Sequence, residues 1–219
     1  MSGPSGLFVT GTGTDVGKSV VAAVLAWEAA QSGLSVGVFK PAVSGLDEGG
    51  ESDHALLRRA SGSDQTDDEI APYRYGPPVS PHLGAEIEGE EIEPRRLLET
   101  AAAARERRDC LIAEGVGGIL VPLAPGYLIR NLAADLALPV VVVASPGLGT
   151  INHTLLTIEA CWTADLDVRA VVLNPWPKRP TKVHRSNLET IADLGGAEVV
   201  TLPKIDLEDM DSWPALGLL

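Results

Sequence analysis

Residues 9–19 read Val-Thr-Gly-Thr-Gly-Thr-Asp-Val-Gly-Lys-Ser, and they join an apolar run, Leu7–Thr10, to an amphipathic segment, Lys18–Ser32. A glycine-rich turn between a strand and a helix directs backbone N–H groups inward, and the helix N-terminus adds about half a positive charge. The stretch therefore predicts a phosphate-binding loop at the first strand-to-helix turn. Lys18 is expected to reach the β- and γ-phosphates of a nucleotide, and Ser19 is expected to bind Mg²⁺.

This loop differs in length from the common pattern G-x-x-x-x-G-K-[ST]. Counting back from Gly17, the first glycine position of that pattern holds Thr12, and Gly11 lies one residue earlier. Lys18 stands where a Rossmann-type fold needs close packing between helix and strand, which disfavours dinucleotide binding. A glycine-rich turn without any ligand is the remaining alternative.

Short apolar runs alternate with longer amphipathic segments along the rest of the chain. The expected strands are Leu7–Thr10, Val36–Phe39, Cys110–Glu114, Pro139–Ala144, Val168–Leu173 and Val199–Leu202. The expected helices are Lys18–Ser32, Asp53–Ala60, Pro94–Arg107, Leu128–Leu136, Asn152–Thr163 and Lys182–Leu194. This alternation predicts an α/β fold of P-loop NTPase type, in which a mostly parallel sheet is flanked by helices on both faces. We expect a single domain over residues 1–219, with residues 62–93 as its loosest part, an excursion from the domain.

The composition excludes several classes of partner. The net charge of −13 repels phosphate backbones, so we expect no nucleic acid and no anionic membrane as partners. No apolar run approaches the ~18 residues of a membrane span, and residues 1–6 contain no basic segment of an export signal. Cys110 and Cys161 lie in apolar segments without a metal-binding pattern, so free thiols and a cytoplasmic location are expected.

Residues 10–19 resemble the opening of the dethiobiotin synthetases, a family that carries this longer loop. Further segments similar to the family follow in the same order: Phe39-Lys-Pro-Ala-Val-Ser-Gly45, Ser52-Asp-His-Ala-Leu56, Val79-Ser-Pro-His82, Glu114-Gly-Val-Gly-Gly118 and Leu148-Gly-Thr-Ile-Asn-His153. Val116 replaces the usual alanine, and the end of the chain matches weakly. The resemblance implies an enzyme that converts 7,8-diaminopelargonate, CO₂ or bicarbonate, and ATP into a cyclic urea, with Mg²⁺ as cofactor.

In this family the reaction passes through a carbamate and a carbamic–phosphoric anhydride. The resemblance implies that Lys40 stabilises the carbamate and the transferred phosphoryl group, with Lys18 as the second cation. It also implies that Thr14 and Asp15 face the diamine, where Asp15 replaces a frequent Glu, and that Ser44 hydrogen-bonds an amine or the carbamate. From the residues alone, Lys40 also fits a surface lysine at the end of a strand.

The family pattern nominates Ser19, Asp53 and Glu114 as ligands of Mg²⁺. This ion prefers hard oxygen ligands, commonly one or two carboxylates with phosphate and water. Glu114 ends an apolar strand, where an acid is unfavourable unless it meets a cation or water. Asp53 also fits a plain helix N-terminus after Ser52, and that alternative stays open.

The resemblance further assigns contacts to the nucleotide. The expected ATP-binding residues are Gly13, Asp15, Val16, Gly17, Lys18, Ser19, Val20, Glu114, Gly115, Gly117, Asn174 and Pro203. The amide of Asn174 both donates and accepts, which matches the N6/N7 edge of adenine. Relatives often have Asn-Asp where this chain has Asn174-Pro175, and an Asn–Pro turn is the alternative for Asn174.

A second glycine-rich turn, Ser145–His153, leads into the expected helix Asn152–Thr163. Free N–H groups at such a helix start can hold a carboxylate. In the family, the second subunit of a homodimer supplies this turn and binds the far carboxylate of the substrate. The resemblance carries that role to Gly149, Thr150, Ile151 and Asn152. Capping of the helix by Thr150 is the alternative.

Two other classes of function remain open. A partition-type ATPase of the same superfamily has an extra lysine near the start of its loop, where this chain has Gly13. An amidating relative needs a glutaminase as a partner or as a further domain, and 219 residues leave no room for an attached one. A non-catalytic nucleotide-binding module is disfavoured because Lys18, Lys40 and Glu114 are all present. Phosphate release that depends on the diamine distinguishes these alternatives.

Overall fold

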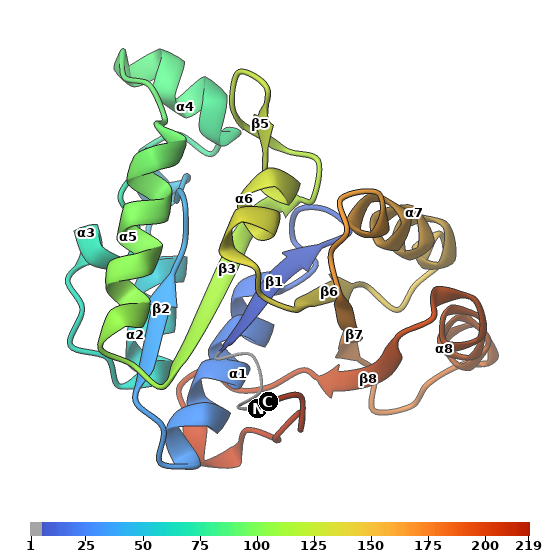
Figure 1. Cartoon of the computed structure of the whole chain (residues 1–219). Coiled ribbons are helices and arrows are strands. Elements are labelled where there is room, and N and C mark those ends of the chain that lie inside the picture. Colours follow the sequence, from blue (N-terminus) through green and yellow to red (C-terminus); the bar gives the residue numbers. More distant parts are fainter. Residues whose placement is uncertain (1–5) are drawn as a thin grey trace.

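The computed structural model of the chain describes residues 6–219, and its centre is a twisted six-stranded sheet (Figure 1). Across the sheet the strands follow the order β2-β3-β1-β6-β7-β8, and each neighbouring pair runs parallel. The strands are β1 Gly6–Gly11, β2 Val36–Phe39, β3 Cys110–Gly118, β6 Val140–Ala144, β7 Val168–Trp176 and β8 Glu198–Pro203. All six predicted strands are therefore confirmed. Residues 1–5, where we expected no export signal, lie outside the described residues.

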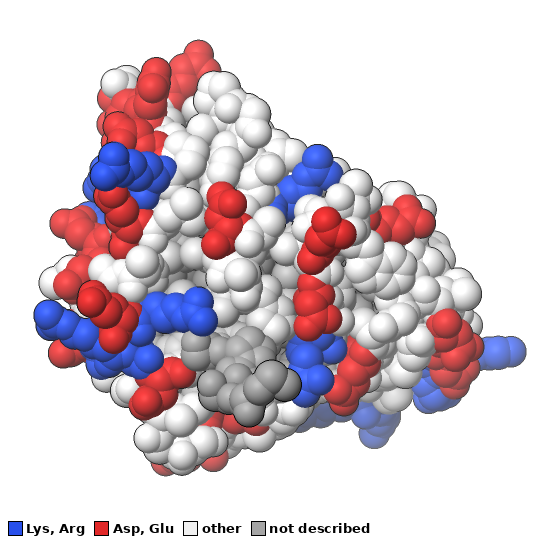
Figure 2. Space-filling model, in the orientation of Figure 1, with Lys and Arg blue, Asp and Glu red and all other residues white. Residues whose placement is uncertain are grey.

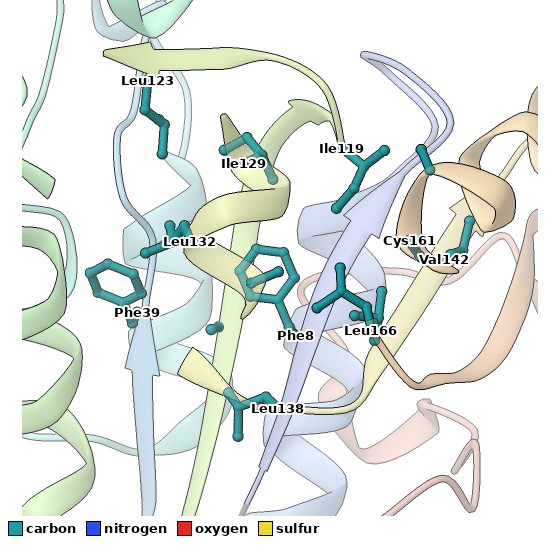
Figure 3. Packing of buried hydrophobic residues seen from close by; sticks show 14 of the residues in the cluster. Phe8, Phe39, Ile119, Leu123, Ile129, Leu132, Leu138, Val142, Cys161 and Leu166 are labelled. Carbon is teal, nitrogen blue, oxygen red and sulfur yellow. The ribbon is translucent and has the colours of Figure 1, made fainter. Parts of the chain in front are cut away.

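Helices cover both faces of this sheet, as predicted. One face packs against α1 (Lys18–Gln31), α2 (Asp53–Ser61) and the C-terminal segment around Trp213. The other face packs against four helices: α5 Pro94–Glu106, α6 Ile129–Leu136, α7 Thr150–Trp162 and α8 Lys182–Gly195. Figure 3 shows this second layer, in which the rings of Phe8 and Phe39 rise from the sheet toward Ile129 and Leu132. Apolar side chains on both faces explain why the strands read as continuous apolar runs.

Residues 62–93 are more structured than the sequence predicts. They form two short helices, α3 (Asp67–Ile70) and α4 (Pro81–Glu88), and they bury the rings of Tyr73 and Tyr75. The reason is that Ile70, Tyr73 and Tyr75 supply apolar area that packs into the core, although acidic residues and prolines surround them. The prediction of a loose segment there is wrong.

Four further elements had no counterpart among the predicted ones. A small hairpin, β4 (Pro122–Ala124) with β5 (Tyr127–Leu128), stands between β3 and α6. Two short 3₁₀ helices, η1 (Leu46–Glu48) and η2 (Met210–Ser212), lie in the connections after β2 and β8. Elements of two to three residues are too short to show a hydrophobic period, so the alternation of longer segments does not reveal them.

Charged side chains lie mostly at the surface. Figure 2 shows acidic side chains gathered at α4 and along α5, interspersed with Lys and Arg. Within residues 6–219, Cys110 and Cys161 are buried and unpaired, as expected, and burial raises the pKa of the Cys110 thiol to about 11. No helix in this part of the chain combines the length and the apolar character that a membrane crossing requires.

Candidate active site

The predicted phosphate loop lies at the carboxyl end of β1, the central strand. Strand β1 ends at Gly11, and α1 begins at Lys18 after Gly17, which adopts a left-handed conformation with φ 85°. A Cβ atom added at Gly17 would lie 2.0 Å from Nδ2 of Asn174, so only glycine fits this position. Because no side chain caps the helix, its first backbone N–H groups remain available to an anion.

Lys18 is folded against the loop that it follows. Its ammonium donates a hydrogen bond to the carbonyl oxygen of Gly13 at 2.9 Å, and the residue is only 7% exposed. Burial lowers the pKa of Lys18, and the nearby carboxylate of Glu114 partly offsets that effect. A buried cation at the start of a helix is suited to meet a strongly negative ligand.

A compact polar cluster lies at the end of β2 and at Glu114, which is the fifth residue of β3, since this strand continues to Gly118 beyond its predicted end. The ammonium of Lys40 lies 2.5 Å from Oε1 of Glu114 and 2.9 Å from Oδ2 of Asp53. The hydroxyl of Ser19, in the first turn of α1, donates to the same Glu114 oxygen at 2.8 Å. Four segments, namely α1, the end of β2, α2 and β3, thus bring a cation, two carboxylates and a hydroxyl together.

The charges in this cluster support one another. Burial opposes the charge of Lys40, but Glu114 and Asp53 together raise its pKa, so the ammonium stays protonated at neutral pH. Burial likewise acts against the Asp53 carboxylate, and Lys40 reverses this and lowers the pKa of Asp53. For Glu114 burial dominates and raises the pKa, because this residue is fully buried.

The oxygen atoms here fit the Mg²⁺ site that the family pattern nominates. Oε2 of Glu114 is buried and has no hydrogen-bond partner, so it is an acceptor in need of a cation or a donor. Ser19 and Asp53 add a hydroxyl and a carboxylate beside it. Within the described residues no three His, Cys, Asp or Glu side chains gather into a complete metal site. An ion at this place therefore needs phosphate or water oxygens as further ligands, which is how Mg²⁺ is commonly bound.

A cavity of about 780 Å³ opens beside this cluster. The predicted site residues that line it are Thr14, Asp15, Gly17, Lys18, Ser19, Val20, Lys40, Ser44, Asp53, Glu114 and Gly117. The sequence-based prediction missed other lining residues, among them Glu48, Glu51, Val79, Ser80, Pro81, Val121 and Leu207. The matching Val79–His82 segment was a signal for part of this wall, whereas nothing local in the sequence pointed to Leu207.

A smaller cavity of about 270 Å³ lies on the other side of the phosphate loop and shares Thr14 with the first. It is lined by Gly13, Val16, Thr150 and the turn that precedes α7. Gly149, Ile151 and Asn152 line neither cavity. Gly149, with φ 91°, occupies the N-cap position of α7 and carries no side chain to cap it, so the helix start is open.

Three predicted nucleotide contacts lie outside both cavities: Gly115, Asn174 and Pro203. The amide of Asn174 is buried and donates to the carbonyl oxygen of Val16 at 3.1 Å, so this residue supports the phosphate loop from β7. Gly115 is packed within the core, where an added Cβ would lie 3.0 Å from Ile129. Pro203 is exposed at the end of β8, paired with Trp176.

Comparison with known proteins adds the family context. The family model AAA_26, described as an AAA domain, matches residues 5–208. The chain is 41% identical to the ATP-dependent dethiobiotin synthetase BioD of Rhodococcus erythropolis, over 95% of each protein. It is 35% identical to the protein of the same name from Bacillus subtilis, over 91% of this chain and 87% of the relative. With that of Anaeromyxobacter dehalogenans it shares 46% identity over 77% of this chain and 76% of the relative.

Solved structures with the same fold are more distant in sequence. The MinC:MinD cell division complex of Aquifex aeolicus contains a chain that matches with a TM-score of 0.59 at 16% identity, over 94% of this chain and 84% of that one. A ParA family ATPase from Chlorobium tepidum matches with a TM-score of 0.56 at 14% identity, over 94% of this chain and 87% of that one. At these identities the likeness establishes the α/β architecture and nothing finer.

Proposed function

The chain belongs to the ATP-dependent dethiobiotin synthetases, and from this premise we propose how its residues close a cyclic urea on 7,8-diaminopelargonate. One amine adds to CO₂ and loses a proton to give a carbamate. A carbamate oxygen then attacks the γ-phosphorus of ATP and releases ADP. Finally the second amine attacks the carbonyl carbon of the mixed anhydride, expels phosphate and closes the ring. We further propose that residues 1–219 act as a single domain in the cytoplasm, where ATP is supplied.

The observation that carries this proposal is the meeting of Lys18, Lys40 and the open N-terminus of α1 in one cavity. Every step before ring closure places negative charge on carbamate or phosphoryl oxygens. Cations that are held in position next to these oxygens therefore lower the activation barrier of each step. We assign Lys40 to the carbamate and the transferred phosphoryl group, and Lys18 to the phosphates. Both are buried, which strengthens their attraction for an anion that enters the cavity.

Mg²⁺ is assigned to Ser19, Asp53 and Glu114. When bound, the ion neutralises charge on the phosphate oxygens and orients them for transfer. The unpartnered Oε2 of Glu114 supports this assignment, since it would gain a ligand bond. Lys40 contacts the same two carboxylates, so its positive charge stabilises the charge of the buried Glu114 and of the partly exposed Asp53.

The diamine is assigned to the wall made by Thr14, Asp15 and Ser44, which lines the same cavity as Lys40. Its carboxylate is assigned to the start of α7 in the second subunit of a homodimer, at Gly149, Thr150, Ile151 and Asn152. The uncapped N-terminus of α7 supports this, because its N–H groups are available for an anion.

Binding of ATP is assigned to the phosphate loop, with Gly13, Val16, Gly17 and Val20 around the phosphates. Gly117 of β3, which lines the cavity, and its neighbour Gly115 are also assigned to ATP, and Asn174 and Pro203 are assigned to the base. Since one N–H of the Asn174 amide already donates to the carbonyl oxygen of Val16, its second N–H and its Oδ1 atom are left for the base.

The test is a direct assay. The protein is incubated with ATP, Mg²⁺, bicarbonate and the diamine, and phosphate release is measured with and without the diamine. We expect release only with the diamine, together with the cyclic urea. Release without the diamine would instead favour a partition-type ATPase, and nucleotide binding without turnover would favour a non-catalytic module.

A further inference from the structure

The cavity of the candidate active site carries more acidic residues than its own cations balance. Five acidic residues line it: Asp15, Glu48, Glu51, Asp53 and Glu114. Glu114 and Asp53 both contact Lys40. Glu51 accepts two hydrogen bonds from the guanidinium of Arg59, at 2.8 and 2.6 Å. These three carboxylates are therefore engaged within the protein, and Asp15 and Glu48 remain.

Glu48 has no partner of its own in the described part of the chain. Within residues 6–219 its side chain makes no hydrogen bond and no ion pair, although it lines the cavity together with Lys40 and Ser44. Its carboxylate points back toward Gly45. If Gly45 carried a Cβ atom, that atom would lie 3.2 Å from Oε2 of Glu48, and Pro78 would also be in contact with it. Gly45 directly follows Ser44, so the Glu48 carboxylate lies next to the segment that carries this residue, which is assigned to the diamine.

We propose that Glu48 is a specificity-determining residue that holds one amino group of the diamine substrate. This inference rests on the proposed function, which requires a substrate with two neighbouring amines. Such a substrate is cationic at neutral pH, and a cavity built for it needs carboxylates that no internal cation neutralises. Asp15, on the phosphate loop, and Glu48, in η1, are the lining carboxylates that form no ion pair within the described residues.

A matched control lies one residue away. Asp47 carries the same charge in the same 3₁₀ helix, but its carboxylate points to Gly76, where Oδ2 lies 2.4 Å from the position of an added Cβ. Asp47 does not line the cavity. Glu48→Gln and Asp47→Asn therefore remove the same charge from neighbouring positions, and only the first removes it from the substrate wall.

The experiment compares steady-state kinetics of the wild type, Glu48→Gln and Asp47→Asn. For Glu48→Gln we expect KM for the diamine to rise about three- to fivefold, the scale of an exposed ion pair, with KM for ATP and kcat unchanged. Asp47→Asn should keep the wild-type KM. An equal rise in both variants, or a parallel fall in KM for ATP, would show a general effect of charge and overturn the proposal.

A second measurement identifies the amine. Two monoamine analogues, each lacking one amino group of the diamine, are tested as inhibitors of the wild type and of Glu48→Gln. The analogue that lacks the amine held by Glu48 should bind both proteins equally, whereas the other should bind the variant more weakly. Equal weakening of both analogues contradicts the proposal. If the wild type shows no diamine-dependent turnover, the proposed function itself fails. An unchanged KM for the diamine in Glu48→Gln, with normal turnover of the wild type, overturns only the role of Glu48.

Discussion

The ammonium of Lys40 lies 2.5 Å from Oε1 of Glu114, although the two residues are 74 positions apart in the sequence. The register of the sheet explains this contact. Strands β2 and β3 are parallel neighbours in which Phe39 pairs with Ala113, so the residue after each of them emerges at the same carboxyl edge. Both side chains are buried, and the charge of each stabilises that of the other.

Replacement of Lys40 by Met should destabilise the protein and abolish turnover. The variant leaves the buried Glu114 carboxylate without its cation, which costs about 3–5 kcal/mol of unfolding free energy. Turnover should fall by orders of magnitude because the variant lacks the cation assigned to the carbamate, while ATP still binds. Urea unfolding and nucleotide titration measure the two effects. The double variant Lys40→Met with Glu114→Gln should recover most of the lost stability. A near-normal rate of turnover in Lys40→Met would contradict the role assigned to Lys40.

Replacement of Gly17 by Ala should weaken nucleotide binding. The added Cβ meets Nδ2 of Asn174 and the residue must keep a positive φ, so the loop has to shift. We expect the Kd for ADP to rise at least tenfold, which is about 1.4 kcal/mol. Gly89→Ala is the control, because Gly89 also has a positive φ but nothing lies within 4 Å of an added Cβ. That variant should lose about 1 kcal/mol of stability and keep its affinity for ADP in calorimetric titration.

Replacement of Ser19 by Ala should act only when Mg²⁺ is present. The hydroxyl is assigned to the ion, so its loss should weaken binding of Mg·ADP by about tenfold, or ~1.4 kcal/mol. Binding of ADP in the presence of a chelator should change little, since the backbone N–H groups of the loop are unaltered. Equal weakening with and without Mg²⁺ would show that Ser19 supports the loop itself rather than the ion.

A pH-dependent contribution to stability is expected from Asp109. Its carboxylate accepts hydrogen bonds from the hydroxyl and the backbone N–H of Ser35, at 2.6 and 2.9 Å, and these lower its pKa below the ordinary value of 3.8. A lowered pKa in the folded state stabilises the protein above pH 3.8, and this stabilisation is lost as the pH falls through the folded-state pKa. Asp109→Asn should therefore be less stable than the wild type at pH 7, and the difference should shrink toward pH 3 in urea unfolding. A difference that is constant with pH would contradict this origin.

Much of the fold follows from local patterns. The six strands are apolar runs, and the helices between them show amphipathic periods, so both are visible without any tertiary information. The phosphate loop is equally local, because Gly17, Lys18 and Ser19 are consecutive and their roles depend on one turn of backbone. Where the local signal is weak, the prediction is wrong. Residues 62–93 are predicted as loose because acidic residues dominate their composition, although Ile70, Tyr73 and Tyr75 are buried.

The sequence by itself thus determined the fold class, the phosphate loop and, through the family resemblance, the residues assigned to catalysis and metal binding. Only the tertiary structure decided which carboxylates are paired, that Asn174 supports Val16 from β7, and that Glu48 and Leu207 reach the cavity. The physical reason is the distance along the chain between the residues that interact. A helix or a loop forms from hydrogen bonds between near neighbours, whereas the partner of a buried charge depends on strand order and register, which bring together residues far apart in the chain.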